Sequence, residues 1–149
     1  NDLRLMNSGP KGGLGEIRLE PLQLGSTIMP GKINPVVPEM VMQVAMKVIA
    51  NDTAITMAAA HGEFELNAFM PLIADSLLES LELLSAATEL FRTKCISSLQ
   101  PNIDRCRELL ELSYAFATAY TPELGYDKVT EIIDESAGDT DLAKELLEK

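Results

Sequence analysis

Apolar side chains recur at helical spacing over most of the chain. Residues 37–60 are apolar or small on nearly every face, a pattern that predicts a long helix buried on all sides. Large apolar residues at helical spacing predict a second long helix over residues 66–95, which Pro71 should bend. Shorter helices are expected at residues 103–119, 126–137 and 141–149. The pattern therefore predicts an all-α protein.

The stretch from residue 9 to residue 35 breaks this periodicity. It contains six glycines and four prolines, so we expect mostly loop, with a short extended piece at residues 16–19. Pro38 fits the first turn of the helix that follows, where its missing N–H costs nothing. A further boundary is expected at Gln100-Pro101-Asn102, and it separates the long helices from the short ones.

Composition and charge exclude some classes of function. The net charge of −11 argues against a nucleic-acid partner, because few cations are available to neutralise phosphates. No uncharged apolar run reaches the ~18 residues that a membrane span needs. Cys95 and Cys106 fit no metal-ligand spacing, so we expect reduced thiols of a cytoplasmic protein and no metal or cofactor. Both chain ends look like interrupted helices, which is typical of a fragment.

The loop over residues 24–35 carries the candidate chemistry. It holds two hydroxyls, Ser26 and Thr27, followed by the ammonium of Lys32 and the amide of Asn34. Lys32 and Asn34 are two residues apart, so an extended backbone points both to one side. Together with the N-terminus of the next helix they could bind a carboxylate or a phosphate. A capped loop with a solvent-exposed lysine is the alternative that these residues leave open.

The amino-acid identities in this loop indicate a function more specifically than its physical properties do. Residues 25–35 resemble the signature G-S-[ST]-x-M-P-x-K-x-N-P of the aspartase/fumarase superfamily. The resemblance also covers Asn1-Asp2-Leu3-Arg4, Ser8-Gly9-Pro10, Gly13-Leu14-Gly15-Glu16-Ile17, Glu65-Leu66-Asn67, Lys94-Cys95-Ile96 and Leu124-Gly125-Tyr126.

The resemblance implies a lyase that removes a proton beside a carboxylate through a dianionic aci-carboxylate. It assigns Ser26 as the base, which backbone N–H groups of a closing loop would have to stabilise. It assigns Lys32 and Asn34 to the substrate carboxylate, with Thr27 beside the base. Glu39 matches a carboxylate that pairs with a histidine of another subunit. A simple first-turn acid is the alternative for Glu39.

The substrate is less clearly indicated. Residues 34–39 resemble aspartate ammonia-lyases, whereas residues 62–67 and 125–128 resemble class II fumarases. Met42 departs from the aspartase pattern. Because residues 34–39 adjoin the carboxylate site, we expect deamination of L-aspartate to fumarate and ammonia. Hydration of fumarate to malate, or a non-catalytic helical oligomerisation module, are the alternatives.

The resemblance also implies an architecture and an assembly. Residues 1–98 would form the C-terminal half of a central helical-bundle domain, and residues 99–149 a small, truncated helical C-terminal domain. The family's sites draw on three subunits of a homotetramer and on segments outside this sequence. We therefore expect the isolated chain to be inactive, and the intact protein to bind a small dicarboxylate.

Overall fold

The computed structural model of the chain describes residues 1–9, 11–23, 29 and 31–148. The protein is predominantly helical, which confirms the all-α prediction. The chain divides into two compact units, Asn1–Gln100 and Pro101–Lys149. No helix that the structure describes is both long enough and apolar enough to cross a membrane.

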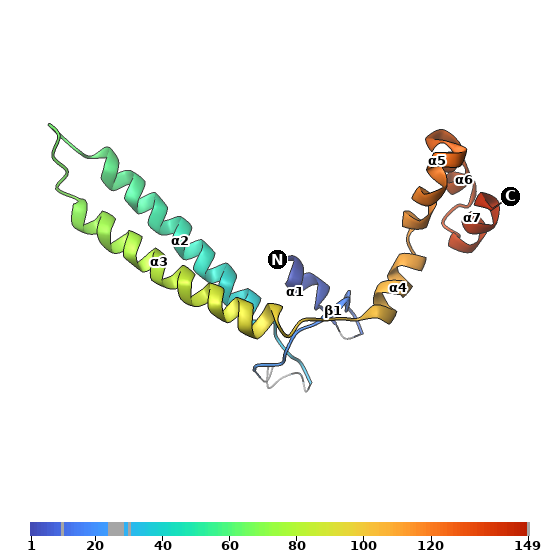
Figure 1. Cartoon of the computed structure of the whole chain (residues 1–149), viewed down its shortest axis with the longest axis horizontal. Coiled ribbons are helices and arrows are strands. Elements are labelled where there is room, and N and C mark those ends of the chain that lie inside the picture. The colour runs from blue at the N-terminus through green and yellow to red at the C-terminus, as the bar shows by residue number, and fades with distance from the viewer. Residues whose placement is uncertain (10, 24–28, 30, 149) are drawn as a thin grey trace. The chain divides into compact units, whose positions relative to one another are not determined.

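Two long helices dominate the first unit. It begins with α1 (Asp2–Met6) and the short strand β1 (Ile17–Arg18), and continues into α2 (Val36–Ala60) and α3 (Met70–Phe91). Figure 1 shows α2 and α3 lying side by side as an antiparallel pair. The extended piece predicted at residues 16–19 is present as β1, which pairs with β2 (Gln100–Pro101).

Asn67 organises the connection between α2 and α3. Its Nδ2 donates to the carbonyl of Ala58 at 3.0 Å, and its Oδ1 accepts from the backbone N–H of Phe69 at 2.8 Å. Phe64 and Glu65, at the tip, adopt left-handed backbone angles (φ 49° and 64°). Successive residues with positive φ are typical of the tightest two-residue turns. The chain therefore reverses direction within a few residues.

The predicted bend at Pro71 was wrong. The helix α3 begins at Met70 and not at residue 66, so Pro71 lies in its first turn. A first-turn proline leaves no hydrogen bond unmade and causes no kink. At its other end α3 continues into a π-helix, η1 (Arg92–Ile96), in which the Cys95 side chain is buried.

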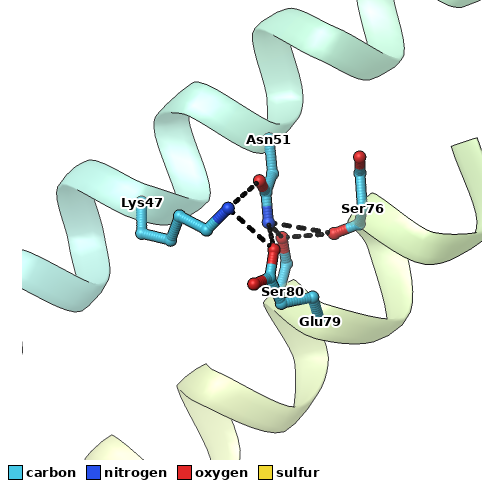
Figure 2. Close-up of polar contacts among 5 residues, drawn as sticks. All are labelled: Lys47, Asn51, Ser76, Glu79 and Ser80. Carbon is cyan, nitrogen blue, oxygen red and sulfur yellow. Dashed lines mark hydrogen bonds and ion pairs between the residues drawn. The ribbon is translucent and has the colours of Figure 1, made fainter. Parts of the chain in front are cut away.

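A buried polar cluster joins α2 to α3 near their middle (Figure 2). Asn51 is 5% exposed, and its Nδ2 donates to Glu79 Oε2 at 2.8 Å and to Ser80 Oγ at 3.0 Å. Lys47 Nζ donates to Asn51 Oδ1 at 3.1 Å. Buried polar groups of this kind are normally satisfied, and here they are satisfied across the two helices.

Short helices pack around their own small core in the second unit. The cluster at this core consists of the buried residues Ala117, Val129, Ile132 and Leu147. The elements are α4 (Ile103–Glu111), the 3₁₀ helix η2 (Tyr114–Tyr120), α5 (Thr121–Leu124), α6 (Tyr126–Glu135) and α7 (Thr140–Leu147).

Two details of the second unit differ from the sequence prediction. The helix expected over residues 103–119 is interrupted at Ser113, whose Oγ accepts from the N–H of Ala115 and begins η2. Residues 121–124, which lie between two of the predicted helices, form α5, and Gly125 caps its C-terminus. Pro122 lies in the first turn of α5, so it starts a helix here instead of interrupting one.

Candidate functional site

An open cavity of about 340 Å³ lies in the first unit beside the start of α2. Its lining includes Lys32 and Asn34 from the loop, Glu39 from α2, and Arg4 from α1. Its volume falls within the range of small-molecule sites. Three of the site residues predicted from the sequence therefore line the same cavity.

A turn places Lys32 at the cavity. Its backbone N–H donates to the carbonyl of Met29 at 3.1 Å, and Gly31, between them, has φ +80°. Residues other than glycine rarely adopt this backbone angle. The carbonyl of Asn34 then accepts from the N–H of Val36 at 2.9 Å, which leads the chain into α2.

Glu39 lies in the first turn of α2, as the sequence predicts. Its N–H donates to the carbonyl of Pro35 at 3.2 Å, and its side chain is 36% exposed. Val37 and Pro38 are buried beside Glu39, and they line a small cavity together with Cys95 of η1. This packing fixes the helix start that carries the carboxylate.

Arg4 is a site residue to which sequence reasoning gave no role. Its Nη2 lies 3.7 Å from Glu39 Oε1, and its Nη1 donates to Met42 Sδ at 3.6 Å. The signal that could have indicated it is a single cation on the short helix α1, close in sequence to the glycine-rich loop. The pairing of Arg4 with Glu39, 35 residues further along, has no sequence signature.

A close backbone approach holds α1 in place. A Cβ on Gly13 would lie 2.4 Å from the Ser8 carbonyl carbon. The N–H of Leu14 donates to Ser8 Oγ at 3.0 Å, and that of Gly15 to the Ser8 carbonyl at 2.7 Å. The glycine segment therefore folds back on the end of α1, the helix that carries Arg4.

Two predicted site residues, Ser26 and Thr27, lie outside the described residues. Within the described ranges, no three His, Cys, Asp or Glu side chains come together in a way that could hold a metal ion. The chemistry that the described residues offer is recognition of an anion by the Lys32 ammonium and the Asn34 amide, beside the Glu39 carboxylate.

Comparisons with known proteins show the family of the chain. A family model described as "Lyase" matches residues 1–50, which include the loop and Glu39. Aspartate ammonia-lyase of Pseudomonas aeruginosa is 50% identical over 89% of the chain. The chain belongs to the aspartase/fumarase superfamily. Fumarate hydratase class II 2 of the same organism is 47% identical over 99% of the chain.

A solved member of the superfamily shares the fold. The class II fumarase from Schistosoma mansoni aligns with 98% of the chain at a TM-score of 0.90 and 37% identity. The chain spans 28% of the aspartate ammonia-lyase, 35% of the fumarate hydratase and 31% of the solved fumarase chain. It thus corresponds to about a third of each of these relatives.

Proposed function

We propose that the full-length protein containing this chain deaminates L-aspartate to fumarate and ammonia. The observation that carries the proposal is the cavity in which Lys32, Asn34 and Glu39 meet. The 50% identity to a relative named aspartate ammonia-lyase supports the choice of substrate. An ammonium and an amide beside one helix start suit a carboxylate ligand.

In the proposed reaction, a base takes a proton from C3 of aspartate, next to the side-chain carboxylate. The electron pair left behind makes that carboxylate a dianion, which needs nearby positive charge and hydrogen-bond donors. Lys32 supplies the charge and Asn34 a neutral donor. The electrons then form the C2=C3 double bond as the C2–N bond breaks. Fumarate and ammonia leave, and the base carries the proton.

Ser26 is the proposed base, with Thr27 beside it as a donor to the substrate. A serine hydroxyl is a poor base unless N–H groups stabilise its oxyanion, and its position in the loop G-S-T-I-M-P-G supports this role through the family motif. Glu39 is the proposed carboxylate that tunes a proton-transferring partner from another subunit. None of these roles requires a metal or a cofactor.

Replacing Ser26 by Ala in the full-length protein tests the proposal. We expect loss of fumarate formation from L-aspartate with the helical content retained, because the base would be missing while the fold is unchanged. Ser97→Ala, an exposed serine at the end of η1, is the matched control and should keep full turnover. Undiminished turnover by the Ser26 variant would refute the assignment.

Hydration of fumarate to L-malate, as in class II fumarases, is the second candidate. The fumarate hydratase relative at 47% identity favours it, as do residues 62–67. The two reactions share the proton removal and differ in the leaving group. Parallel assays with L-aspartate and L-malate separate them, since turnover of malate alone would reverse the choice.

The proposed assembly is a homotetramer in the cytoplasm, with residues 1–98 in its central bundle and residues 99–149 as a small helical domain. Apolar residues on α2 support burial against further chains, because Met46, Ile49 and Met57 are each more than 60% exposed. Light scattering of the full-length protein should give the mass of four chains. A stable tetramer without turnover would instead favour a non-catalytic oligomerisation module.

A further inference from the structure

We propose that Arg4 is a positioning residue of this site, which holds the Glu39 carboxylate in a fixed orientation at the cavity. The inference rests on the proposed lyase function and deepens it. It assigns a role to α1, whose last turn carries Arg4 and precedes the glycine-rich loop.

The geometry of the Arg4 guanidinium supports this role. Nη2 lies 3.7 Å from Glu39 Oε1, while Nη1 donates to Met42 Sδ at 3.6 Å. Glu39 and Met42 are three residues apart on α2, so they lie on the same face of that helix. The planar guanidinium therefore contacts two residues of α2 that lie one helical turn apart. A flexible ammonium could not make both contacts with the same geometry.

The same contacts argue against Arg4 as a direct substrate ligand. Its Nε is buried and has no hydrogen-bond partner, so that edge of the guanidinium is closed to a ligand. The edge formed by Nη1 and Nη2 faces Met42 and Glu39. A bidentate carboxylate needs one free edge. Arg4 is therefore oriented towards Glu39 and not towards a substrate.

Among the described residues, Arg4 is the ion-pair partner of Glu39. Lys32 lines the same cavity from the loop. The remaining titratable groups on the elements nearest the start of α2 lie on α1, on η1 and at the end of α3, and none of them pairs with Glu39 in the described part of the chain. They are Asp2, Arg92, Lys94, Cys95 and Glu89.

A guanidinium beside a carboxylate restricts the orientations that the carboxylate adopts. Removing the Arg4 guanidinium should therefore lower kcat more than it raises KM, because Glu39 is proposed to act in proton transfer and not in substrate binding. A residue that only supports the fold would lower activity or yield whether or not Glu39 is present. The dependence of the loss on Glu39 therefore separates positioning from simple structural support.

The test uses the full-length protein with Arg4→Met, Arg4→Lys, Glu39→Gln and the double variant Arg4→Met/Glu39→Gln. We expect Arg4→Met to lower kcat/KM by about 10- to 100-fold, mainly through kcat. Arg4→Lys should restore part of the lost kcat, because it keeps the charge but not the planar group. In the Glu39→Gln background, Arg4→Met should cost less than about twofold, because its target is already neutral.

Equal losses from Arg4→Met in the presence and absence of Glu39 would overturn the proposal. A rise in KM alone, with kcat unchanged, would also overturn it, because that result indicates direct substrate binding. If Arg4→Met does not fold by circular dichroism, the cycle is run with Arg4→Gln, which removes the charge and keeps a polar side chain, and its additivity with Glu39→Gln would overturn the proposal in the same way. Wild-type protein that turns over neither aspartate nor malate would refute the lyase function itself.

Discussion

The Lys47 ammonium lies 2.9 Å from Glu79 Oε2 and links α2 to α3 next to the buried Asn51 (Figure 2). Asn51 also donates to the carbonyl of Ser76 at 3.2 Å, so its two amide hydrogens are shared among three acceptors on α3. A polar cluster of this kind is satisfied in one alignment of the helices and broken in others. It therefore selects the register of the pair.

Asn51→Ala should destabilise the helix pair. The substitution removes the amide partner of the buried Ser80 Oγ and of the half-exposed Lys47 Nζ, at a cost of about 1–3 kcal/mol. Asp52→Ala, at the neighbouring exposed position of α2, is the control and should change stability by about 0.5 kcal/mol or less. Chemical denaturation of the full-length protein measures both. Equal stabilities of the two variants would contradict the role of the cluster.

Glu79 should make stability depend on pH. Hydrogen bonds from Lys47 and from Asn51 lower the pKa of the Glu79 carboxyl below its ordinary value. A lowered folded-state pKa adds stability that is complete above the ordinary glutamate pKa, about 4.3, and is lost as pH falls through the lowered value. The stability difference between wild type and Glu79→Gln should therefore stay constant from neutral pH down to the ordinary glutamate pKa and shrink as the pH falls further. A difference that stays constant below that pKa as well would disprove the linkage.

Lys32→Met should impair catalysis by the full-length protein. Loss of the ammonium at the cavity removes charge that the dianionic intermediate requires, and we expect kcat/KM to fall by about 100- to 1,000-fold. Lys11→Met is the control, because Lys11 is an exposed lysine of the glycine-rich segment that does not line the cavity. Steady-state kinetics with L-aspartate decide the matter, and similar rates for both variants would count against carboxylate binding by Lys32.

Gly13→Ala should destabilise the first unit, whereas Gly12→Ala should not. A Cβ at Gly13 would lie 2.4 Å from the Ser8 backbone, but one at Gly12 meets nothing within 4 Å. The clash should cost about 1–3 kcal/mol and loosen the end of α1. Thermal or chemical denaturation of the two variants measures the difference. The close approach would be disproved if both alanines had the same small effect.

The two thiols should differ in reactivity. Cys95 is 1% exposed, and burial raises the pKa of its thiol, whereas Cys106 is exposed. Because the thiolate is the reactive form, an alkylating reagent at mildly alkaline pH should label Cys106 well before Cys95. Peptide mass spectrometry measures the ratio, and unfolding in denaturant should remove the difference. Equal labelling of the native protein would show that Cys95 is accessible.

The sequence predicted the features that depend on residues close together along the chain. The run of apolar and small residues over 37–60 predicted α2, because a long run of this kind fits a continuous helix. The start of α3 was misplaced because Leu66 and Phe69 continue the helical spacing of the apolar residues that follow. Asn67, however, uses its amide to close the turn, so the helix begins only at Met70. The spacing of apolar residues alone does not show that the Asn67 side chain bonds backbone groups in this segment.

By itself, then, the sequence determined the helical class, the glycine-rich segment and a loop motif that predicts the carboxylate-binding pair Lys32 and Asn34. Only the tertiary structure decided that Arg4 meets Glu39, and that Lys47 and Asn51 meet Glu79. The physical reason is that these partners come from different helices, 28 to 35 positions apart. Their contacts depend on how the helices pack, and no local repeat or motif records that packing.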